Sequence, residues 1–89
     1  MNSRKENLEA FNRLLDILDE LREKCPWDRE QTNESLRANT IEETYELSEA
    51  LLSNDSDEIK KELGDLLLHI AFYAKIGEEK KEFDIGDVC

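Results

Sequence analysis

The chain has 89 residues, 38% of them hydrophobic and 39% charged, and its formal net charge is −11. This length suits one small domain, and the negative charge argues against nucleic acids and anionic membrane surfaces as partners. No stretch approaches the roughly 18 apolar residues of a membrane span, and the polar N-terminus has no signal-peptide pattern. Cys25 and Cys89 are too few for a disulfide framework, so we expect reduced thiols and a cytoplasmic location.

The first predicted helix covers about residues 5–24, where apolar side chains recur at helical spacing and a polar residue just before the start can cap it. Pro26 stops this helix, because it lacks a backbone donor and disfavours the helical conformation for the residue before it. We expect residues 29–32 to form a polar turn, and residues 33–37 to form no more than one helical turn.

Trp27 has two interpretations. A lone tryptophan beside a proline often acts as a wedge that pins a loop. Alternatively, the ring of Trp27 stacks on a nucleobase, while Asp28 and Gln31 offer acceptors and donors to the edge of that base. The residues themselves leave both interpretations open.

The second predicted helix covers about residues 40–52 and ends at the Asn-Asp-Ser segment 54–56. Thr40 fits the N-cap of a capping box, with Glu43 at the third helical position. This capping role competes with any role of Glu43 in binding a ligand.

The third predicted helix begins after Asp55, which can cap it, and reaches about residue 76. Gly64 in its middle costs roughly 1 kcal/mol relative to alanine, so we expect another backbone or a ligand to approach closely there. His69 lies four residues after Asp65 on the same face, and we interpret it as a packed or hydrogen-bonded residue rather than a catalytic one.

Four carboxylates on these two helices form the main candidate site. Residues three apart share a helix face, so Glu43 pairs with Glu46, and Glu62 pairs with Asp65. If the helices pack antiparallel, the two pairs face each other and repel unless a cation lies between them. Oxygen ligands suit Mg²⁺ or Mn²⁺. The alternative is an ordinary solvated acidic surface, but the apolar residues beside these carboxylates favour the metal site.

The C-terminal segment is predicted to contain a charged turn at residues 77–82 and the start of a fourth helix. Phe83 precedes Asp84 as in a hydrophobic staple, and Asp87 lies in the first turn. The chain stops at Cys89, about one turn later, so we expect a fragment that ends early in its last helix. A core this thin on amphipathic helices also makes oligomerisation an expected source of stability.

Several segments together resemble the MazG nucleotide pyrophosphohydrolases of the short, single-domain type. They are CPWD at 25–28, QT at 31–32, EExxE at 42–46, ELGD at 62–65 and FD at 83–84. The resemblance covers about Leu14 to the C-terminus, and it makes residues 1–89 one MazG-like domain. It implies an all-α, four-helix-type bundle completed by oligomerisation as a dimer or tetramer. It also implies Mg²⁺-dependent hydrolysis of nucleoside triphosphates to monophosphate and pyrophosphate, often as housecleaning of damaged nucleotides.

The resemblance assigns roles position by position. The implied metal ligands are Glu43, Glu46, Glu62 and Asp65. Glu42 would position or deprotonate water, with Glu43 as the other candidate base. The implied substrate contacts are Trp27, Asp28 and Gln31 near the base, and Lys60 and Lys61 at the phosphates. Family members carry further basic residues beyond the start of the fourth helix, in a segment that this sequence does not contain.

Three alternatives stay open. A di-iron carboxylate bundle would need Glu-x-x-His motifs on facing helices, whereas the motifs here are Glu-x-x-Glu and Glu-x-x-Asp. A non-catalytic helical interaction module would use its acidic faces only for solubility. A related pyrophosphohydrolase would act on dUTP or phosphoribosyl-ATP instead.

Overall fold

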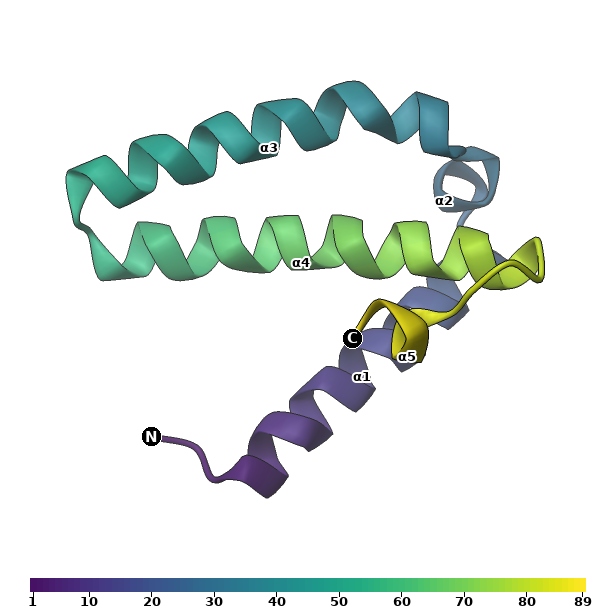
Figure 1. The fold of residues 1–89 in the computed structure, drawn as a ribbon, viewed down its shortest axis with the longest axis horizontal. Helices are drawn as coiled ribbons and strands as arrows, with labels where there is room; N and C mark the ends of the chain where they lie inside the picture. Colours follow the sequence, from purple (N-terminus) through teal and green to yellow (C-terminus); the bar gives the residue numbers. More distant parts are fainter. The chain divides into compact units, whose positions relative to one another are not determined.

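The computed structural model describes residues 1–89, which form five α-helices and no β-strand. The all-α class expected from the sequence is therefore confirmed. The chain divides into two compact units, residues 1–31 and residues 32–89, which we describe separately (Figure 1). None of the helices combines the length and the apolar character needed to cross a membrane.

The first unit contains α1 (Arg4–Lys24) and α2 (Pro26–Glu30). Ser3 caps α1 in a reciprocal box with Glu6, in which each side chain accepts the other residue's backbone N–H. The polar turn expected at residues 29–32 is wrong for its first half, because α2 continues through Glu30. Pro26 ends one helix and begins the next, since its missing donor is tolerated in a first helical turn.

Arg22 of α1 holds the end of α2 in place. Its Nη1 donates hydrogen bonds to the carbonyl oxygens of Asp28, Arg29 and Gln31, at 2.6, 3.1 and 2.8 Å. The last carbonyls of a helix lack partners within the helix, and a cation there also complements the negative end of the helix dipole. This segment is thus anchored by one guanidinium group.

The second unit is built on a hairpin of two long antiparallel helices, α3 (Asn33–Ser53) and α4 (Ser56–Glu79) (Figure 1). α3 begins at Asn33 rather than near Thr40. Its cap is Thr32, whose Oγ1 accepts from the Ser35 N–H at 3.1 Å, while Ser35 Oγ accepts from the Thr32 N–H at 2.7 Å. The predicted capping box of Thr40 and Glu43 is therefore wrong, and Glu43 is free for other roles.

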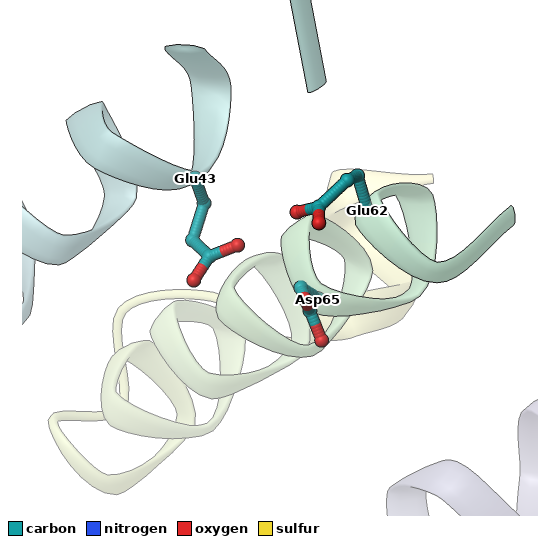
Figure 2. Close-up of side chains that lie close together, drawn as sticks. All are labelled: Glu43, Glu62 and Asp65. Carbon is teal, nitrogen blue, oxygen red and sulfur yellow. The ribbon is translucent and has the colours of Figure 1, made fainter. Parts of the chain in front are cut away.

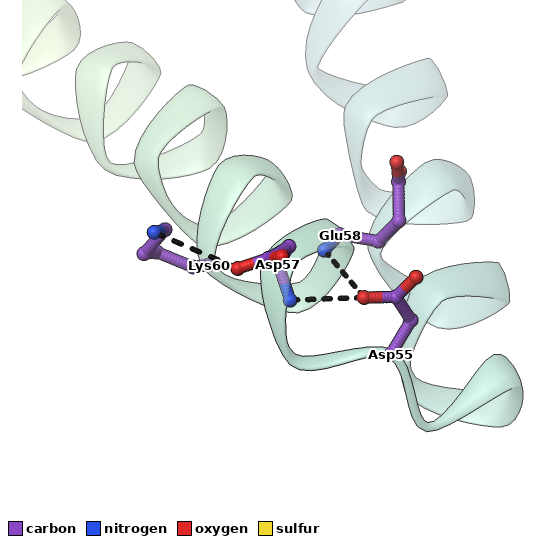
Figure 3. Close-up of polar contacts among 4 residues, drawn as sticks. All are labelled: Asp55, Asp57, Glu58 and Lys60. Atoms are coloured by element: carbon purple, nitrogen blue, oxygen red, sulfur yellow. Dashed lines mark hydrogen bonds and ion pairs between the residues drawn. The ribbon is translucent and has the colours of Figure 1, made fainter.

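The connection between α3 and α4 is short and fixed by local hydrogen bonds. Asn54 adopts the left-handed conformation, with φ 59°, and ends α3. The Asp55 carboxylate then accepts the backbone N–H groups of Asp57 and Glu58 at 3.0 and 3.4 Å, which confirms the predicted cap of α4 (Figure 3). Because the turn is this tight, residues at matching distances from it on the two helices face each other.

α4 continues three residues past its predicted end and closes with a Schellman motif. Lys81 has φ 60°, the Glu82 N–H bonds to the Gly77 carbonyl at 3.0 Å, and the Lys81 N–H bonds to the Glu78 carbonyl at 2.9 Å. The first residues of the predicted charged turn, 77–79, are thus helical, and Gly77 is buried.

The chain after α4 folds back through Phe83 to the short helix α5 (Ile85–Val88). A Cβ on Gly77 would lie 2.6 Å from the Phe83 ring, so the ring rests directly on the glycine backbone. Asp84 caps α5 in a reciprocal box with Asp87, as the sequence predicts.

The two glycines of α4 give a matched pair of substitutions. Around Gly64 no atom lies within 4 Å of a built Cβ, so the expected approach by another part of the chain is wrong, and approach by a ligand stays a prediction. We expect Gly64→Ala to raise the free energy of unfolding in urea by about 0.5–1 kcal/mol through helix propensity. The increase in unfolding free energy should be much smaller for Gly77→Ala, because the added methyl group displaces the Phe83 ring.

Hydrogen exchange separates the two substitutions locally. Amides of residues 82–88 should exchange faster in Gly77→Ala and at the wild-type rate in Gly64→Ala. Equal unfolding energies and equal exchange for the two variants would contradict the contact between Phe83 and Gly77.

Candidate metal centre

Three carboxylates from the two long helices meet inside the hairpin. Glu43 comes from α3, and Glu62 and Asp65 come from α4; one ligand oxygen of each lies within 4.8 Å of the others. Figure 2 shows Glu43 and Glu62 directed toward each other across the hairpin, with Asp65 beside Glu62 on the same helix. The facing arrangement predicted from residue spacing is confirmed for these three side chains.

The local folding explains why they meet. Glu62 and Asp65 are three residues apart, so they lie on one face of α4. The antiparallel hairpin then brings Glu43 opposite them. Glu62 is 6% exposed, and Glu43 and Asp65 are half-buried, so the cluster lies at the inner surface of the helix pair.

The electrostatics of the cluster are unfavourable without a cation. Burial, followed by the charges of Glu46 and Asp65, raises the pKa of both Glu43 and Glu62 above the ordinary value. Glu43 Oε2 and Glu62 Oε2 are buried and have no hydrogen-bond partner. Unpartnered buried carboxylate oxygens cost free energy unless a proton or a metal ion satisfies them.

The donor set fits a hard divalent cation. All three side chains offer only oxygen, which Mg²⁺ and Mn²⁺ prefer and which is a poor match for soft metals. The residues present would therefore hold Mg²⁺ or Mn²⁺.

Known proteins share sequence and fold with this chain. The MazG nucleotide pyrophosphohydrolase domain matches residues 31–89, which include every carboxylate of the cluster. The chain belongs to the MazG family. It is 42% identical over 85 residues to a nucleoside triphosphate pyrophosphohydrolase of Escherichia coli K12, covering 92% of this chain and 32% of that protein.

Two Thermotoga maritima proteins are also similar. The chain is 49% identical over 80 residues to the nucleoside triphosphate pyrophosphohydrolase/pyrophosphatase MazG, covering 88% of this chain and 31% of that protein. The crystal structure of a MazG-related protein matches with a TM-score of 0.76 at 28% identity, over 86% of this chain and 68% of that one. The chain thus spans about a third of the length of these curated MazG relatives.

The fourth predicted carboxylate, Glu46, borders the other three, and its side chain interacts with that of Glu62. Glu46 is exposed and is not among the oxygens that meet within 4.8 Å, although its charge raises the pKa of Glu43 and Glu62. It lines an adjoining cavity of about 390 Å³ together with Glu49, Glu58 and Glu62. Glu42, next to Glu43 on α3, is exposed. Their roles in this MazG chain stay predictions.

The predicted phosphate and base contacts are surface residues. Lys60 and Lys61 are exposed near the start of α4, and Lys60 Nζ lies 3.8 Å from Asp57 Oδ1 (Figure 3). Trp27 is 55% exposed and belongs to the first unit. Arg22 holds the segment of Trp27 in place. Both interpretations of Trp27, the wedge and the base contact, stay predictions.

Gln31 and Asp28 are partly committed to local structure. The Gln31 amide donates to the Trp27 carbonyl at 2.9 Å. The Asp28 carbonyl accepts from Arg22, which leaves the Asp28 side chain available. Substrate contact by these two residues stays a prediction as well.

Sequence reasoning missed a polar cluster next to the carboxylates. Thr40 Oγ1 lies 2.8 Å from His69 Nδ1 and also hydrogen-bonds with Tyr73 Oη, which joins α3 to α4. The positions of Thr40 and His69 in the sequence could have indicated this contact. In an antiparallel hairpin that places Glu43 opposite Asp65, the residues one turn farther from the connection also face each other.

Proposed function

We propose that this MazG chain forms the catalytic core of a Mg²⁺-dependent nucleoside triphosphate pyrophosphohydrolase, which converts a nucleoside triphosphate and water to a nucleoside monophosphate and pyrophosphate. The observation that carries the proposal is the set of buried, unpartnered oxygens on Glu43 and Glu62 beside Asp65. The names of the E. coli and T. maritima relatives support the substrate class.

Glu43, Glu62 and Asp65 would hold the cation, and Glu46 would complete the site from the adjoining turn of α3. When bound, the cation neutralises charge on the phosphates and polarises a phosphoryl oxygen. Neutralisation is needed because a chain with a net charge of −11 otherwise repels a triphosphate.

The chain's own carboxylates supply the remaining chemistry. A water attacks the α- or the β-phosphorus, and the phosphoanhydride bond between them breaks. Pyrophosphate leaves in the first case and the nucleoside monophosphate in the second, and a proton must leave the water. Glu43 is suited to accept that proton, because burial and the neighbouring carboxylates raise its pKa above the ordinary value. Exposed Glu42 is the other candidate base.

An exposed apolar row on α4 supports assembly of the chain into a homodimer or homotetramer. Leu63, Leu67 and Ile70 follow helical spacing along one face and are 40–50% exposed. Burying this row against a second copy would add stability to a thin core.

Sedimentation equilibrium should give at least twice the monomer mass, and Leu67→Lys should lower the measured mass. A monomeric wild type would reject this part of the proposal.

Pyrophosphate release from a panel of nucleotides tests the activity. The panel contains the common ribo- and deoxyribonucleoside triphosphates, dUTP, oxidised nucleotides and phosphoribosyl-ATP, each with Mg²⁺, with Mn²⁺ and with EDTA. We expect metal-dependent release that EDTA abolishes. Preference for oxidised nucleotides would support a housecleaning role. A folded chain that binds Mg²⁺ but releases pyrophosphate from no nucleotide would favour the interaction module instead.

A further inference from the structure

Thr40 stands at the centre of a polar cluster that links the two helices. Its Oγ1 lies 3.1 Å from the Leu36 carbonyl oxygen and 2.8 Å from His69 Nδ1, and it forms a short hydrogen bond with Tyr73 Oη. Thr40, His69 and Tyr73 are all half-buried. Because the Thr40 hydroxyl has three hydrogen-bond partners, the donor and the acceptor in each of these bonds can be assigned.

Proton accounting assigns the tautomer of His69. A hydroxyl has one proton to donate and two lone pairs that accept, whereas a carbonyl oxygen only accepts. All three contacts are hydrogen bonds only if Thr40 donates to Leu36 and accepts from both His69 and Tyr73. His69 therefore carries its proton on Nδ1, and Tyr73 donates its phenolic proton.

The cluster lies next to the metal centre on both helices. Thr40 precedes Glu43 by three residues and His69 follows Asp65 by four, so each lies one helical turn from a carboxylate of the centre. In the absence of a cation, the repulsion among Glu43, Glu62 and Asp65 pushes α3 and α4 apart. The hydrogen bonds of Thr40 with His69 and Tyr73 join α3 to α4 about one helical turn from the carboxylates, and they oppose that separation.

We propose that Thr40, His69 and Tyr73 are positioning residues that hold Glu43 at the spacing from Glu62 and Asp65 that a divalent cation requires. The proposal rests on the proposed metal centre and deepens it. None of the three belongs to the carboxylate group that would hold the cation. Partners that orient metal ligands typically contribute 10–100-fold to metal affinity, and we expect a weakening of roughly 10-fold when the Thr40 hydroxyl is lost.

Metal titration of matched variants tests the proposal without relying on activity. Binding of Mn²⁺ is followed by electron paramagnetic resonance and Mg²⁺ by calorimetry on the whole chain. Thr40→Val removes the hydroxyl at nearly constant shape, and Thr40→Ser restores it. Thr44→Val is the control, because Thr44 on the same helix also donates a hydroxyl hydrogen bond, to the Thr40 carbonyl at 2.9 Å, but makes no link to α4.

We expect Kd for Mn²⁺ to rise about 10-fold in Thr40→Val, to return near wild type in Thr40→Ser, and to stay unchanged in Thr44→Val. Tyr73→Phe, which keeps the ring, should weaken binding as well and replaces Thr40→Val if that variant does not fold. Equal affinity in wild type, Thr40→Val and Tyr73→Phe would overturn the proposal while leaving the metal centre intact. A wild type that binds no Mn²⁺ would instead reject the metal centre itself.

The tautomer gives an independent spectroscopic check. Long-range ¹H–¹⁵N spectra of the imidazole distinguish a proton on Nδ1 from a proton on Nε2. We expect His69 with the proton on Nδ1 in the wild type and a mixed population in Thr40→Val. A neutral His69 that carries its proton on Nε2 in the wild type would overturn the hydrogen-bond scheme.

Discussion

Glu43→Gln is expected to lower kcat/KM for pyrophosphate release by about 100-fold or more, the loss seen when one charge-stabilising group is removed from an active site. The substitution keeps the size of the side chain but removes both the negative charge toward the cation and the candidate base. Initial rates at the lowest Mg²⁺ concentration that saturates the wild type measure the effect. Glu34→Gln is the matched control, because Glu34 is an exposed residue in the first turn of the same helix.

Metal binding separates the two roles of Glu43. If Glu43 acts mainly as a ligand, raising the Mg²⁺ concentration should recover part of the rate in Glu43→Gln. If it acts mainly as the base, the rate stays low at all Mg²⁺ concentrations while the metal still binds. A rate within threefold of Glu34→Gln would remove Glu43 from the mechanism.

Helix periodicity made the metal centre predictable in outline. Carboxylates three residues apart necessarily share a helix face, and a short connection makes two helices antiparallel. Glu43, Glu62 and Asp65 could therefore be brought together from the sequence. The exposure of Glu46 could not be predicted, because the axial rotation of one helix against the other depends on packing across their whole length.

Local signals misled the prediction at the start of α3. The Thr40–Glu43 pair fits a capping box as well as Thr32–Ser35 does, and both are short-range patterns. Burial of Leu36 favours the cap at Thr32, because Leu36 lies in the helical turn that this cap begins. Once that turn is helical, Thr40 lies inside the helix and its hydroxyl becomes available to α4.

Tertiary contacts explain the remaining differences. The charged composition of residues 77–82 predicts a turn, but Gly77 accommodates the Phe83 ring within a helix. The polar residues 29–32 predict a turn, but the first two belong to α2. The hydrogen bonds from Arg22 to carbonyl oxygens of this segment stabilise it.

Glu62→Gln is expected to melt at a higher temperature than the wild type at pH 7 in EDTA. Burial, then the charges of Glu46 and Asp65, raise the pKa of Glu62 above 4.5, the ordinary value. The folded chain therefore binds this proton more tightly than the unfolded chain. The resulting stability is fully present below pH 4.5 and is lost as the pH rises through the raised pKa. Glutamine is neutral throughout and avoids that loss.

Melting curves by circular dichroism between pH 4 and pH 8 measure this difference, with Glu34→Gln as the control. The advantage of Glu62→Gln should be small at pH 4 and should grow as the pH rises through the raised pKa of Glu62. If the difference in melting temperature between Glu62→Gln and the wild type is constant across this range, ionisation of Glu62 does not destabilise the metal-free protein.

Mg²⁺ should reverse the order of stability, because only the wild type presents the complete carboxylate site. A ligand at 100 times its Kd stabilises the folded state by about 2.7 kcal/mol, which corresponds to roughly 10–20 °C in the melting temperature of a domain this small. The melting temperature of Glu62→Gln should rise by only a fraction of that amount when Mg²⁺ is added. A substitution that stabilises the empty protein and destabilises the metal-loaded one identifies a residue retained for binding at the expense of folding. Equal gains from Mg²⁺ in both proteins would mean that the cation binds elsewhere.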